Sequence, residues 1–492
     1  MKRLFWLGFA LYVYMICTGC GETFRPIIIP NPPVFPNPKA AHTVLSINDN
    51  GDFVPGSAMV IDVSGDTNVS TVNSDIHPIQ AVQQSATQVL VVNRAVIGLN
   101  VPTSSCLVTA AGQTYDVCPS ITKLNFNSTV ISGTQTISLP PYSGSNFVAV
   151  APSSPLAYVT MPTYPPDPTH PLTIVPTVGV INTQSNNLVE TISVDSNPFA
   201  LAVTPDNSKL YVANNSTPCT DPATPGICSI SAFNTVDRSA RTVSGTLSSA
   251  PIWLTPRSDS QRVYVLEANG TLGSIDTTST AGPDVFSEST IGVPNATIMV
   301  YDSNLNRLYI PGGDEIAIVD VSQSTPVIMA GGPIMVPTAS PTSRSSSDPC
   351  AETAEQQLKV VAATALPDGS RAYVGSYYED LSDNICPQVT VIDVASNTIK
   401  GSPIAIPGFP AYDAFCGLAE SSGGPRFRLM MAAAGDSSRA YLSSCDGGNV
   451  NIVNTTGDTY FLNLPAPLGS RPPIPPSQLN PPQNPVFLLA GP

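Results

Sequence analysis

The feature that most constrains the fold of this chain is a repeat of four short apolar segments separated by turns. One copy begins at 197–203 (Asn-Pro-Phe-Ala-Leu-Ala-Val), continues through a turn at 204–209 and an apolar run at 210–214, and ends with runs at 229–233 and 241–247. Short alternating runs bounded by turn residues are typical of β-strands. Four such strands in a repeating unit predict one blade of a β-propeller.

The turn before the second strand of each unit recurs with one pattern. Asp or Asn heads the turn, Arg or Lys closes it, and Tyr follows with one residue between. The turns and their tyrosines are 206–209 with Tyr211, 259–262 with Tyr264, 304–307 with Tyr309, 368–371 with Tyr373, and 436–439 with Tyr441; weaker copies lead to Tyr158 and Leu90. Because Asp and Asn accept hydrogen bonds from nearby backbone amides in turns, we interpret the pattern as a turn signal rather than a repeated ligand site.

A second marker, an apolar pair ending in Asp or Asn, closes the third strand of each unit. It occurs eight times, at Asp62, Asn127, Asn182, Asn234, Asp276, Asp320, Asp393 and Asn454. The C-terminal segment 484–490 resembles the start of a unit, whereas 43–47 resembles a second strand. Pairing the two ends in one shared blade would close the ring and remove exposed sheet edges. We therefore predict an all-β propeller with eight four-stranded blades; seven blades is the rival if the terminal segments only cap a neighbour.

The second strands also carry a family resemblance. The run Tyr211-Val212-Ala213-Asn214 resembles the YVTN-type β-propeller repeats of bacterial and archaeal envelope proteins, with Ala where the family has Thr. The run Tyr158-Val159-Thr160-Met161 departs from the pattern at its last position. The similarity covers nearly everything from about residue 41. It implies an envelope propeller but not an activity, because such proteins serve as surface-layer proteins, binding modules and occasionally enzymes.

The N-terminus resembles a bacterial lipoprotein signal. Lys2 and Arg3 precede an apolar run at 4–16 that is too short to span a bilayer comfortably and suits a signal peptide. Gly19-Cys20 matches the lipobox, although Cys17 stands where the family usually has Leu. We predict a signal peptide at 1–20 with Cys20 lipidated, a Pro-rich linker at 21–40 and a single propeller domain at 41–492. The protein would be exported to the outer membrane or periplasmic face with only a lipid anchor in the membrane; simple secretion and a structural disulfide at Cys20 are the alternatives.

Charge bears on the class of partner. The formal net charge is −15, with 35 acidic against 20 basic residues. A surface this negative repels phosphate backbones, so we expect no nucleic-acid binding.

The cysteines predict disulfides. An even number in an exported protein favours bridges, and the eight besides Cys17 and Cys20 are Cys106, Cys118, Cys219, Cys228, Cys350, Cys386, Cys416 and Cys445. The first two share one loop and the next two share another. The last four occupy loops between second and third strands and connections between blades. Both loop types emerge on the same face of a propeller, so Cys350–Cys386 and Cys416–Cys445 are geometrically sensible pairs, although spacing alone does not fix the connectivity.

All long insertions fall in these two loop types, and we call the face on which they emerge the looped face and the opposite one the turn face. The insertions are 93–120, 161–174, 214–228, 337–357, 376–387, 407–425 and 465–484. Binding surfaces usually lie on such loops. Candidate contact residues are Tyr164, Asp167, His170, Tyr377, Tyr378, Glu379, Asp380, Asp383, Tyr412, Asp413 and Phe415. The aromatic and acidic run 377–383 would suit a carbohydrate, a cationic partner or Ca²⁺.

The sequence lacks the motifs of several common enzymes. His42, His77 and His170 fall in different repeats, and there is no GxSxG elbow or Gly-rich phosphate loop. Quinone-dependent propeller dehydrogenases use Trp in most blades, whereas only Trp253 follows the signal segment. We predict a non-catalytic binding or scaffolding protein without a cofactor, whose partner is an envelope protein or glycan. The alternatives are a lactonase-like hydrolase, which would need a polar cluster at the channel mouth, and a structural lattice subunit.

Overall fold

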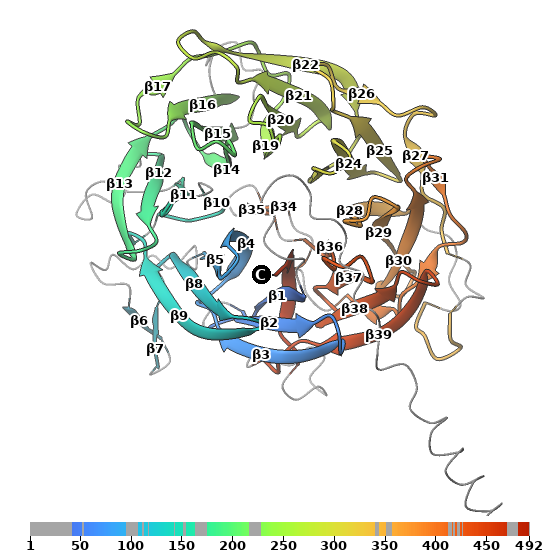
Figure 1. Ribbon diagram of the computed structural model, residues 1–492. Coiled ribbons are helices and arrows are strands. Elements are labelled where there is room, and N and C mark those ends of the chain that lie inside the picture. Colours follow the sequence, from blue (N-terminus) through green and yellow to red (C-terminus); the bar gives the residue numbers. More distant parts are fainter. Residues whose placement is uncertain are drawn as a thin grey trace, which may run out of the picture.

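The structure is a computed structural model. The described residues are 42–51, 54–94, 107–110, 113–116, 118–141, 143–150, 154–162, 175–215, 228–339, 344–350, 357–411, 416, 419–420, 424–425, 427–469 and 481–491. They form eight four-stranded blades arranged in a ring (Figure 1), which confirms the eight-bladed propeller. No helix in these ranges is long and apolar enough to span a membrane. The predicted signal peptide, Cys20 and linker lie outside them.

We number the blades 1–8 along the chain and describe each from its innermost strand outward. Blade 1 contains β40 (Asn484–Ala490), β1 (Thr43–Asp49), β2 (Ser57–Asp62) and β3 (Thr67–Asn73); blade 2, β4 (Pro78–Ser85), β5 (Gln88–Asn93), β8 (Ser120–Asn127) and β9 (Val130–Ser138); blade 3, β10 (Val148–Val150), β11 (Leu156–Met161), β12 (Thr177–Asn182) and β13 (Asn187–Ser193); blade 4, β14 (Pro198–Val203), β15 (Lys209–Asn215), β16 (Cys228–Asn234) and β17 (Ala240–Arg241).

The later blades are built in the same way, but in blades 6 and 7 the outer strand is divided into short pieces that all pair with the third strand. Blade 5 contains β19 (Pro251–Pro256), β20 (Arg262–Glu267), β21 (Thr271–Asp276) and β22 (Asp284–Gly292), with β18 (Val243–Ser244) beside β22; blade 6, β23 (Val300–Asp302), β24 (Arg307–Gly312), β25 (Glu315–Asp320), β26 (Val327–Ile328) and β27 (Ile334–Met335); blade 7, β28 (Lys359–Ala365), β29 (Arg371–Glu379), β30 (Asn384–Asp393), β31 (Thr398–Ile399), β32 (Ile404–Ala405) and β33 (Phe409–Pro410); blade 8, β36 (Leu429–Ala433), β37 (Arg439–Ser444), β38 (Asn449–Asn454) and β39 (Thr459–Pro465). Two small hairpins, β6 (Leu107–Ala110) with β7 (Gln113–Asp116) and β34 (Ala419–Glu420) with β35 (Gly424–Pro425), lie outside the blades.

The ring closes through the two ends of the described chain. Strand β40 pairs antiparallel with β1, so that Val44 lies opposite Ala490 and Ile47 opposite Phe487. The first and last strands thus share blade 1, as the sequence predicts. This pairing removes the rival arrangement in which the terminal segments only cap a neighbouring blade.

The Asp and Asn markers end the third strands. All eight are the last residues of β2, β8, β12, β16, β21, β25, β30 and β38. Several cap the following turn with the side chain, as when the Ser64 amide donates to Asp62 at 3.2 Å and the Ser322 amide donates to Asp320 at 2.8 Å. Such bonds satisfy amides that the sheet ladder leaves free. The marker is therefore a strand-ending and turn-forming signal.

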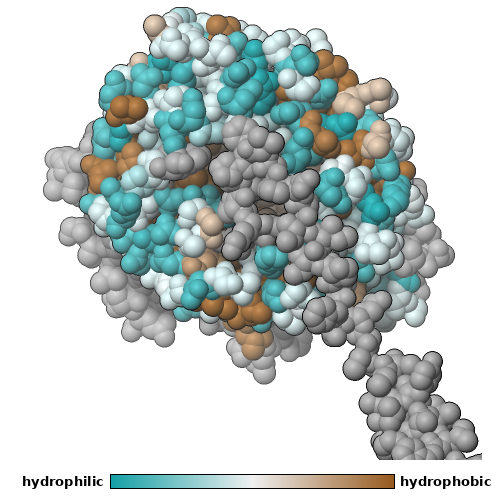
Figure 2. Space-filling model, viewed as in Figure 1, coloured by the Kyte–Doolittle hydropathy of each residue, from teal (hydrophilic) through white to brown (hydrophobic). Residues whose placement is uncertain are grey.

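Apolar faces of neighbouring blades pack together and make up most of the core. One cluster joins Val159 and Ile181 of blade 3 to Leu90 and Ile121 of blade 2, and comparable clusters fill the other seams. The exposed apolar residues on the outer strands are isolated, and Figure 2 shows brown areas separated by teal and white ones. Scattered apolar residues of this kind are normal for a soluble surface.

The basic residue and the tyrosine of the repeated turn contact the next blade. Arg439 of blade 8 pairs with the Asp66 carboxylate of blade 1 at 2.9 Å, and the Tyr441 hydroxyl donates to it at 3.3 Å. The Tyr373 hydroxyl of blade 7 donates to Asp458 of blade 8 at 2.6 Å. In each pair the acceptor lies in the turn between the third and fourth strands of the following blade. The repeated turn therefore also holds neighbouring blades together.

The most buried of these contacts joins blades 4 and 5. The Asp284 carboxylate, which has no exposed surface, accepts from Lys209 at 2.7 Å, from the Tyr211 hydroxyl at 2.8 Å and from Arg241 at 3.1 Å. Burial alone would raise the pKa of Asp284, but the hydrogen bonds from Arg241, Lys209 and Tyr211 lower it. The carboxylate is thus stabilised in its charged form.

Other seams use a backbone acceptor in the same place. The Tyr264 hydroxyl donates to the carbonyl of Val321 at 3.2 Å, and Arg307 donates to the carbonyl of Val394 at 2.9 Å. We refer to all these contacts as the blade clamps; their donors are Lys209, Tyr211, Tyr264, Arg307, Arg371, Tyr373, Arg439 and Tyr441.

Candidate functional site

The described connections agree with the predicted distribution of loops, except that the predicted insertion 376–387 is mostly the extended ends of β29 and β30, joined by a turn at 380–383. Six predicted insertions connect β5 to β8, β11 to β12, β15 to β16, β27 to β28, β29 to β30 and β39 to β40, and the seventh lies between β32 and β36. All are links from a second to a third strand or from one blade to the next. In an antiparallel blade these links emerge at the same end. The looped face is therefore a real feature of the ring.

Two disulfides brace this face in blades 7 and 8. Cys350 is bonded to Cys386 and Cys416 to Cys445, the two pairs that the loop positions favoured. Each joins a connection between blades to the blade that follows, at the third strand for Cys386 and just after the second strand for Cys445. Closing loops of this size stabilises the fold by a few kcal/mol, about 2–4 in typical proteins. Cys118 and Cys228 are also disulfide-bonded; Cys106 and Cys219 lie outside the described residues.

The predicted contact residues Tyr377 and Tyr378 lie at the end of β29 and are buried. Their exposed fractions are 6% and 2%. Lys359 and Arg428 lie against the Tyr377 ring, 5.5 and 5.3 Å from its centroid, and Arg344 lies 5.8 Å from that of Tyr378. Burial raises the pKa of Tyr377, with the two nearby cations opposing the shift. In this arrangement both tyrosines support the loops from within.

Glu379 connects the same cations into an ion cluster. It accepts from Lys359 at 2.8 Å and from Arg428 at 3.0 Å, and Arg428 also pairs with the buried Asp446 at 2.9 Å. The hydrogen bond from Lys359 is the main cause that lowers the pKa of Glu379, against a smaller effect of burial. Lys359 and Glu379 are partly exposed, so the cluster presents both charges to solvent. We call Lys359, Tyr377, Glu379, Arg428 and Asp446 the loop cluster.

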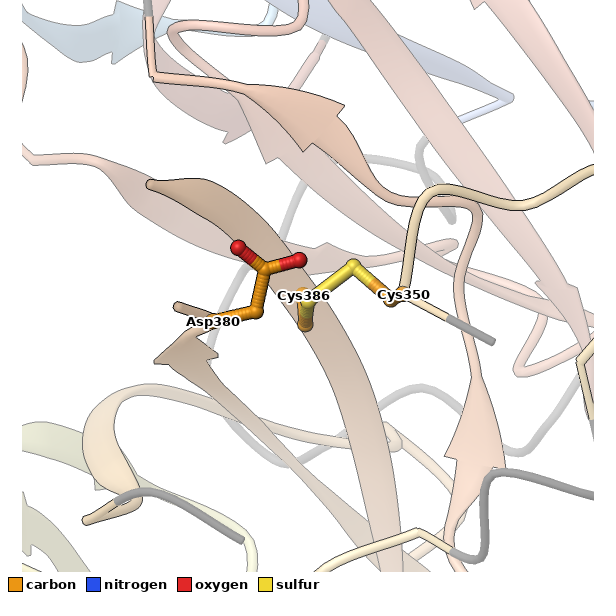
Figure 3. A group of neighbouring side chains, drawn as sticks. All are labelled: Cys350, Asp380 and Cys386. Carbon is orange, nitrogen blue, oxygen red and sulfur yellow. A yellow bond between two sulfur atoms is a disulfide. The ribbon is translucent and has the colours of Figure 1, made fainter. Parts of the chain in front are cut away.

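Asp380 stands beside the Cys350–Cys386 disulfide (Figure 3). Together the three side chains have the donor types of a metal site, but thiolates bind metals and the sulfur atoms here are bonded to each other. The Asp380 carboxylate accepts from the amides of Ser382 and Asn384 at 2.7 and 2.8 Å. In the disulfide form this group closes a hairpin and offers no metal-binding set.

The tip of this hairpin projects into solvent. Leu381 is 80% exposed, and Ser382 and Asp383 are exposed beside it. Asp383 has a positive φ of 57°, and its amide donates to the Asp380 carbonyl at 3.2 Å. The tip is therefore a tight turn held on buried tyrosines, a disulfide and the loop cluster. The remaining predicted contact residues, Tyr164, Asp167, His170, Tyr412, Asp413 and Phe415, lie outside the described residues.

A row of aromatic rings crosses the ring axis, and sequence analysis did not single it out. Trp253 at the start of blade 5 lies 6.1 Å from Phe427 of blade 8 and 5.4 Å from Phe147 of blade 3. Phe427 lies 6.5 Å from Phe487 of blade 1, and Phe147 lies 5.7 Å from Phe199 of blade 4. Blades 5 and 8 are not neighbours (Figure 1), so their rings can meet only near the axis. We call these five residues the aromatic belt.

The belt lies toward the looped face. Phe147 and Phe427 lie just before innermost strands, Phe199 lies near the start of one, and Trp253 and Phe487 lie in the first four residues of theirs; these strands start where the connections between blades enter. The belt thus places apolar rings at this end of the channel, whereas the buried His77–Asp49 pair, 3.1 Å apart, lies at the same end of blades 1 and 2. The sequence shows aromatic residues in or just before several first strands, and this pattern could have pointed to the belt. The contacts between their rings form only when the ring of blades closes.

Comparisons with known proteins show the fold alone. No family model matches the chain, and no curated protein matches its sequence. Among solved structures, Citrobacter koseri AztD shares 10% identity over 86% of this chain and 94% of its own, with a TM-score of 0.52. The dihydro-heme d1 dehydrogenase NirN shares 11% identity over 89% of this chain and 75% of its own, with a TM-score of 0.54. The Pseudomonas aeruginosa periplasmic gluconolactonase PpgL shares 9% identity over 86% of this chain and 94% of its own, with a TM-score of 0.46.

Proposed function

We propose that the protein is an exported bacterial lipoprotein that binds an envelope protein or glycan through its looped face and catalyses no reaction. The observation that carries this proposal is the construction of the hairpin around Leu381. A disulfide, two buried tyrosines and the loop cluster fix a short exposed tip. A preorganised loop loses little conformational entropy when a partner binds, which favours a recognition role.

The aromatic belt supports binding over hydrolysis. A lactonase-like propeller needs polar groups that converge at the channel mouth, whereas the rings of Trp253, Phe427 and Phe487 meet on the axis near the looped face. Buried aromatic rings contribute packing and exclude water. These packed rings would support the surrounding loops rigidly.

The proposed anchor rests on the N-terminal sequence. The lipobox-like Gly19-Cys20, the prolines of 21–40 and the YVTN-like second strands together favour an envelope propeller held off a membrane. The substitution Cys20→Ala should abolish incorporation of labelled palmitate and release the protein from the membrane fraction. Label retained in the Cys20→Ala variant would contradict lipidation at this residue.

The looped-face proposal is tested by capture from envelope extract with the tagged full-length protein. Leu381→Glu changes the exposed tip, and Val236→Glu is the matched control, since Val236 is 85% exposed in a turn on the opposite face. We expect the wild-type protein and Val236→Glu to capture the same partner and Leu381→Glu to lose at least 90% of it. Equal capture by all three would overturn the proposal.

A further inference from the structure

Two glutamates of blade 5 converge on one serine. Glu267 is the last residue of β20, and its Oε2 accepts from the Ser249 amide at 2.6 Å and from the Ser248 hydroxyl at 3.1 Å. The Ser248 amide donates to Oε1 of Glu288 at 2.5 Å. The two carboxylates therefore lie on either side of Ser248, at the looped-face end of the blade.

One carboxylate oxygen of this pair is buried without a partner. Glu267 has no exposed surface, and its Oε1 makes no hydrogen bond. Neither Glu267 nor Glu288 belongs to an ion pair within the described parts of the chain. A buried, unpartnered carboxylate oxygen is costly unless a proton or a cation lies beside it. Asp284 in the same sheet provides a contrast, because Lys209, Tyr211 and Arg241 all donate to its carboxylate. That carboxylate therefore needs no bound cation, unlike Glu267.

Glu288 also lines a groove on the outer side of the blade. The groove has a volume of about 360 Å³ and runs between β22 and the turn that follows β25. Serine and threonine hydroxyls line much of it, and its basic residue, Arg262, is matched by Asp276 at 3.0 Å. Side chains alternate along β22, so the Glu288 carboxylate lies on the opposite face from Ser287; it is exposed, and a small cation can reach it directly from solvent.

We propose that Glu267 and Glu288 form a calcium site at the looped-face end of blade 5. The free oxygens are carboxylate oxygens, which a hard cation prefers, whereas zinc favours nitrogen and sulfur ligands. Ca²⁺ tolerates irregular coordination and water ligands, whereas Mg²⁺ demands near-ideal octahedral geometry. Glu267 Oε1 and the Glu288 carboxylate would bind the ion, with water completing its shell. The site is independent of the partner proposed for the Leu381 tip.

A proton is the competing ligand of the pair. Burial above all raises the pKa of Glu267 to about 7, against a hydrogen bond from the Ser249 amide; the charge of Glu288 and a hydrogen bond between the two carboxyl groups raise it further. The charged group that faces Glu267 is Glu288. Calcium must displace this proton, so calcium affinity should rise between pH 6 and pH 8.

Calorimetric titration of the full-length protein in detergent with CaCl₂ tests the site. Wild-type protein should bind one calcium ion at pH 8. The substitutions Glu267→Gln and Glu288→Gln should each weaken this binding at least tenfold. Glu315→Gln is the matched control, because Glu315 lies beside Asp314 on the neighbouring blade as a partly exposed acidic pair. At calcium a hundredfold above its dissociation constant, the melting temperature of the wild type and of Glu315→Gln should rise by about 3 °C.

The glutamine variants also separate loss of the site from loss of the fold. In EDTA at pH 8 both should melt at or above the wild-type temperature, because the substitution removes repulsion between two carboxylates. No binding by the wild type at pH 8, or equal affinity in Glu267→Gln and Glu288→Gln, would overturn the proposal. An equal response to MgCl₂ would contradict the choice of calcium.

Discussion

The two faces of the ring stabilise the protein in different ways. On the turn face, the repeated turn supplies an arginine, lysine or tyrosine that binds the next blade, as with Tyr211 and Lys209 on Asp284. On the looped face, the connections differ from blade to blade and are held by disulfides and by the loop cluster. The repeated positions therefore build the ring, and the unrepeated ones are free to carry a binding surface.

The largest expected effect is at a blade clamp. Asp284→Ala removes the partner of two buried cations and should destabilise the protein by about 3–5 kcal/mol in urea unfolding at pH 7. Because hydrogen bonds lower the pKa of Asp284 below its ordinary 3.8, this stabilisation is present above pH 3.8 and is lost as the pH falls through the folded-state value. The difference between variant and wild type should therefore shrink in acid.

Asp237→Ala is the control for the clamp, since Asp237 lies in a turn of blade 4 and only caps Ser239. We expect its unfolding curve to match that of the wild type closely. Equal destabilisation by both substitutions would remove the special role assigned to the clamp.

The looped face should respond to loss of its disulfide. Replacing Cys350 and Cys386 together by serine opens a bridge across 36 residues and should cost about 3 kcal/mol in urea unfolding. Limited proteolysis should then cut first near the hairpin tip at 381–383. Unfolding at the wild-type urea concentration would show that the loop cluster alone holds this face.

A smaller, pH-dependent effect is expected at the acidic pair of blade 5. The raised pKa of Glu267, about 7, means that the folded protein holds a proton that the unfolded chain releases near 4.5. In calcium-free buffer the stability should therefore fall as the pH rises from about 5 to 8, by about 2 kcal/mol. Glu267→Gln should flatten this slope in urea unfolding measured across the same range, and an unchanged slope would contradict the assignment.

The smallest effect on stability is expected at the hairpin tip. Leu381 is largely exposed, so Leu381→Glu should change the free energy of unfolding by less than about 0.5 kcal/mol. The same variant should lose its partner in the capture experiment. Destabilisation by more than about 1 kcal/mol would mean that the tip belongs to the structural framework and that lost capture reports unfolding.

The sequence was sufficient for features that depend on neighbours in the chain. The eight Asp and Asn markers located the ends of the third strands, and the echo of 197–203 in 484–490 predicted the shared blade. The topology of a blade then placed the loops that contain Cys350 and Cys386 on one face. Each of these inferences needs only local patterns and the antiparallel order of four strands.

Features that depend on distant segments were not predicted. Tyr377 is buried because Lys359 and Arg428, from other strands and connections, close over it, so an aromatic residue expected to contact a ligand is part of the support. Trp253 and Phe427 meet only after the ring has closed. Likewise, the acceptors of Tyr211, Tyr264, Tyr373 and Tyr441 could not be seen in the sequence, because each lies in the next blade.

The division between a structural turn face and a binding looped face is tested most directly by photo-crosslinking in intact cells. A photoreactive amino acid would replace Ser382 at the looped-face tip in one strain and Asp237 in a turn of the opposite face in another, both at exposed positions. The account predicts a specific crosslinked species from position 382 and none from position 237. Crosslinks only from position 237, or none from position 382, would contradict it.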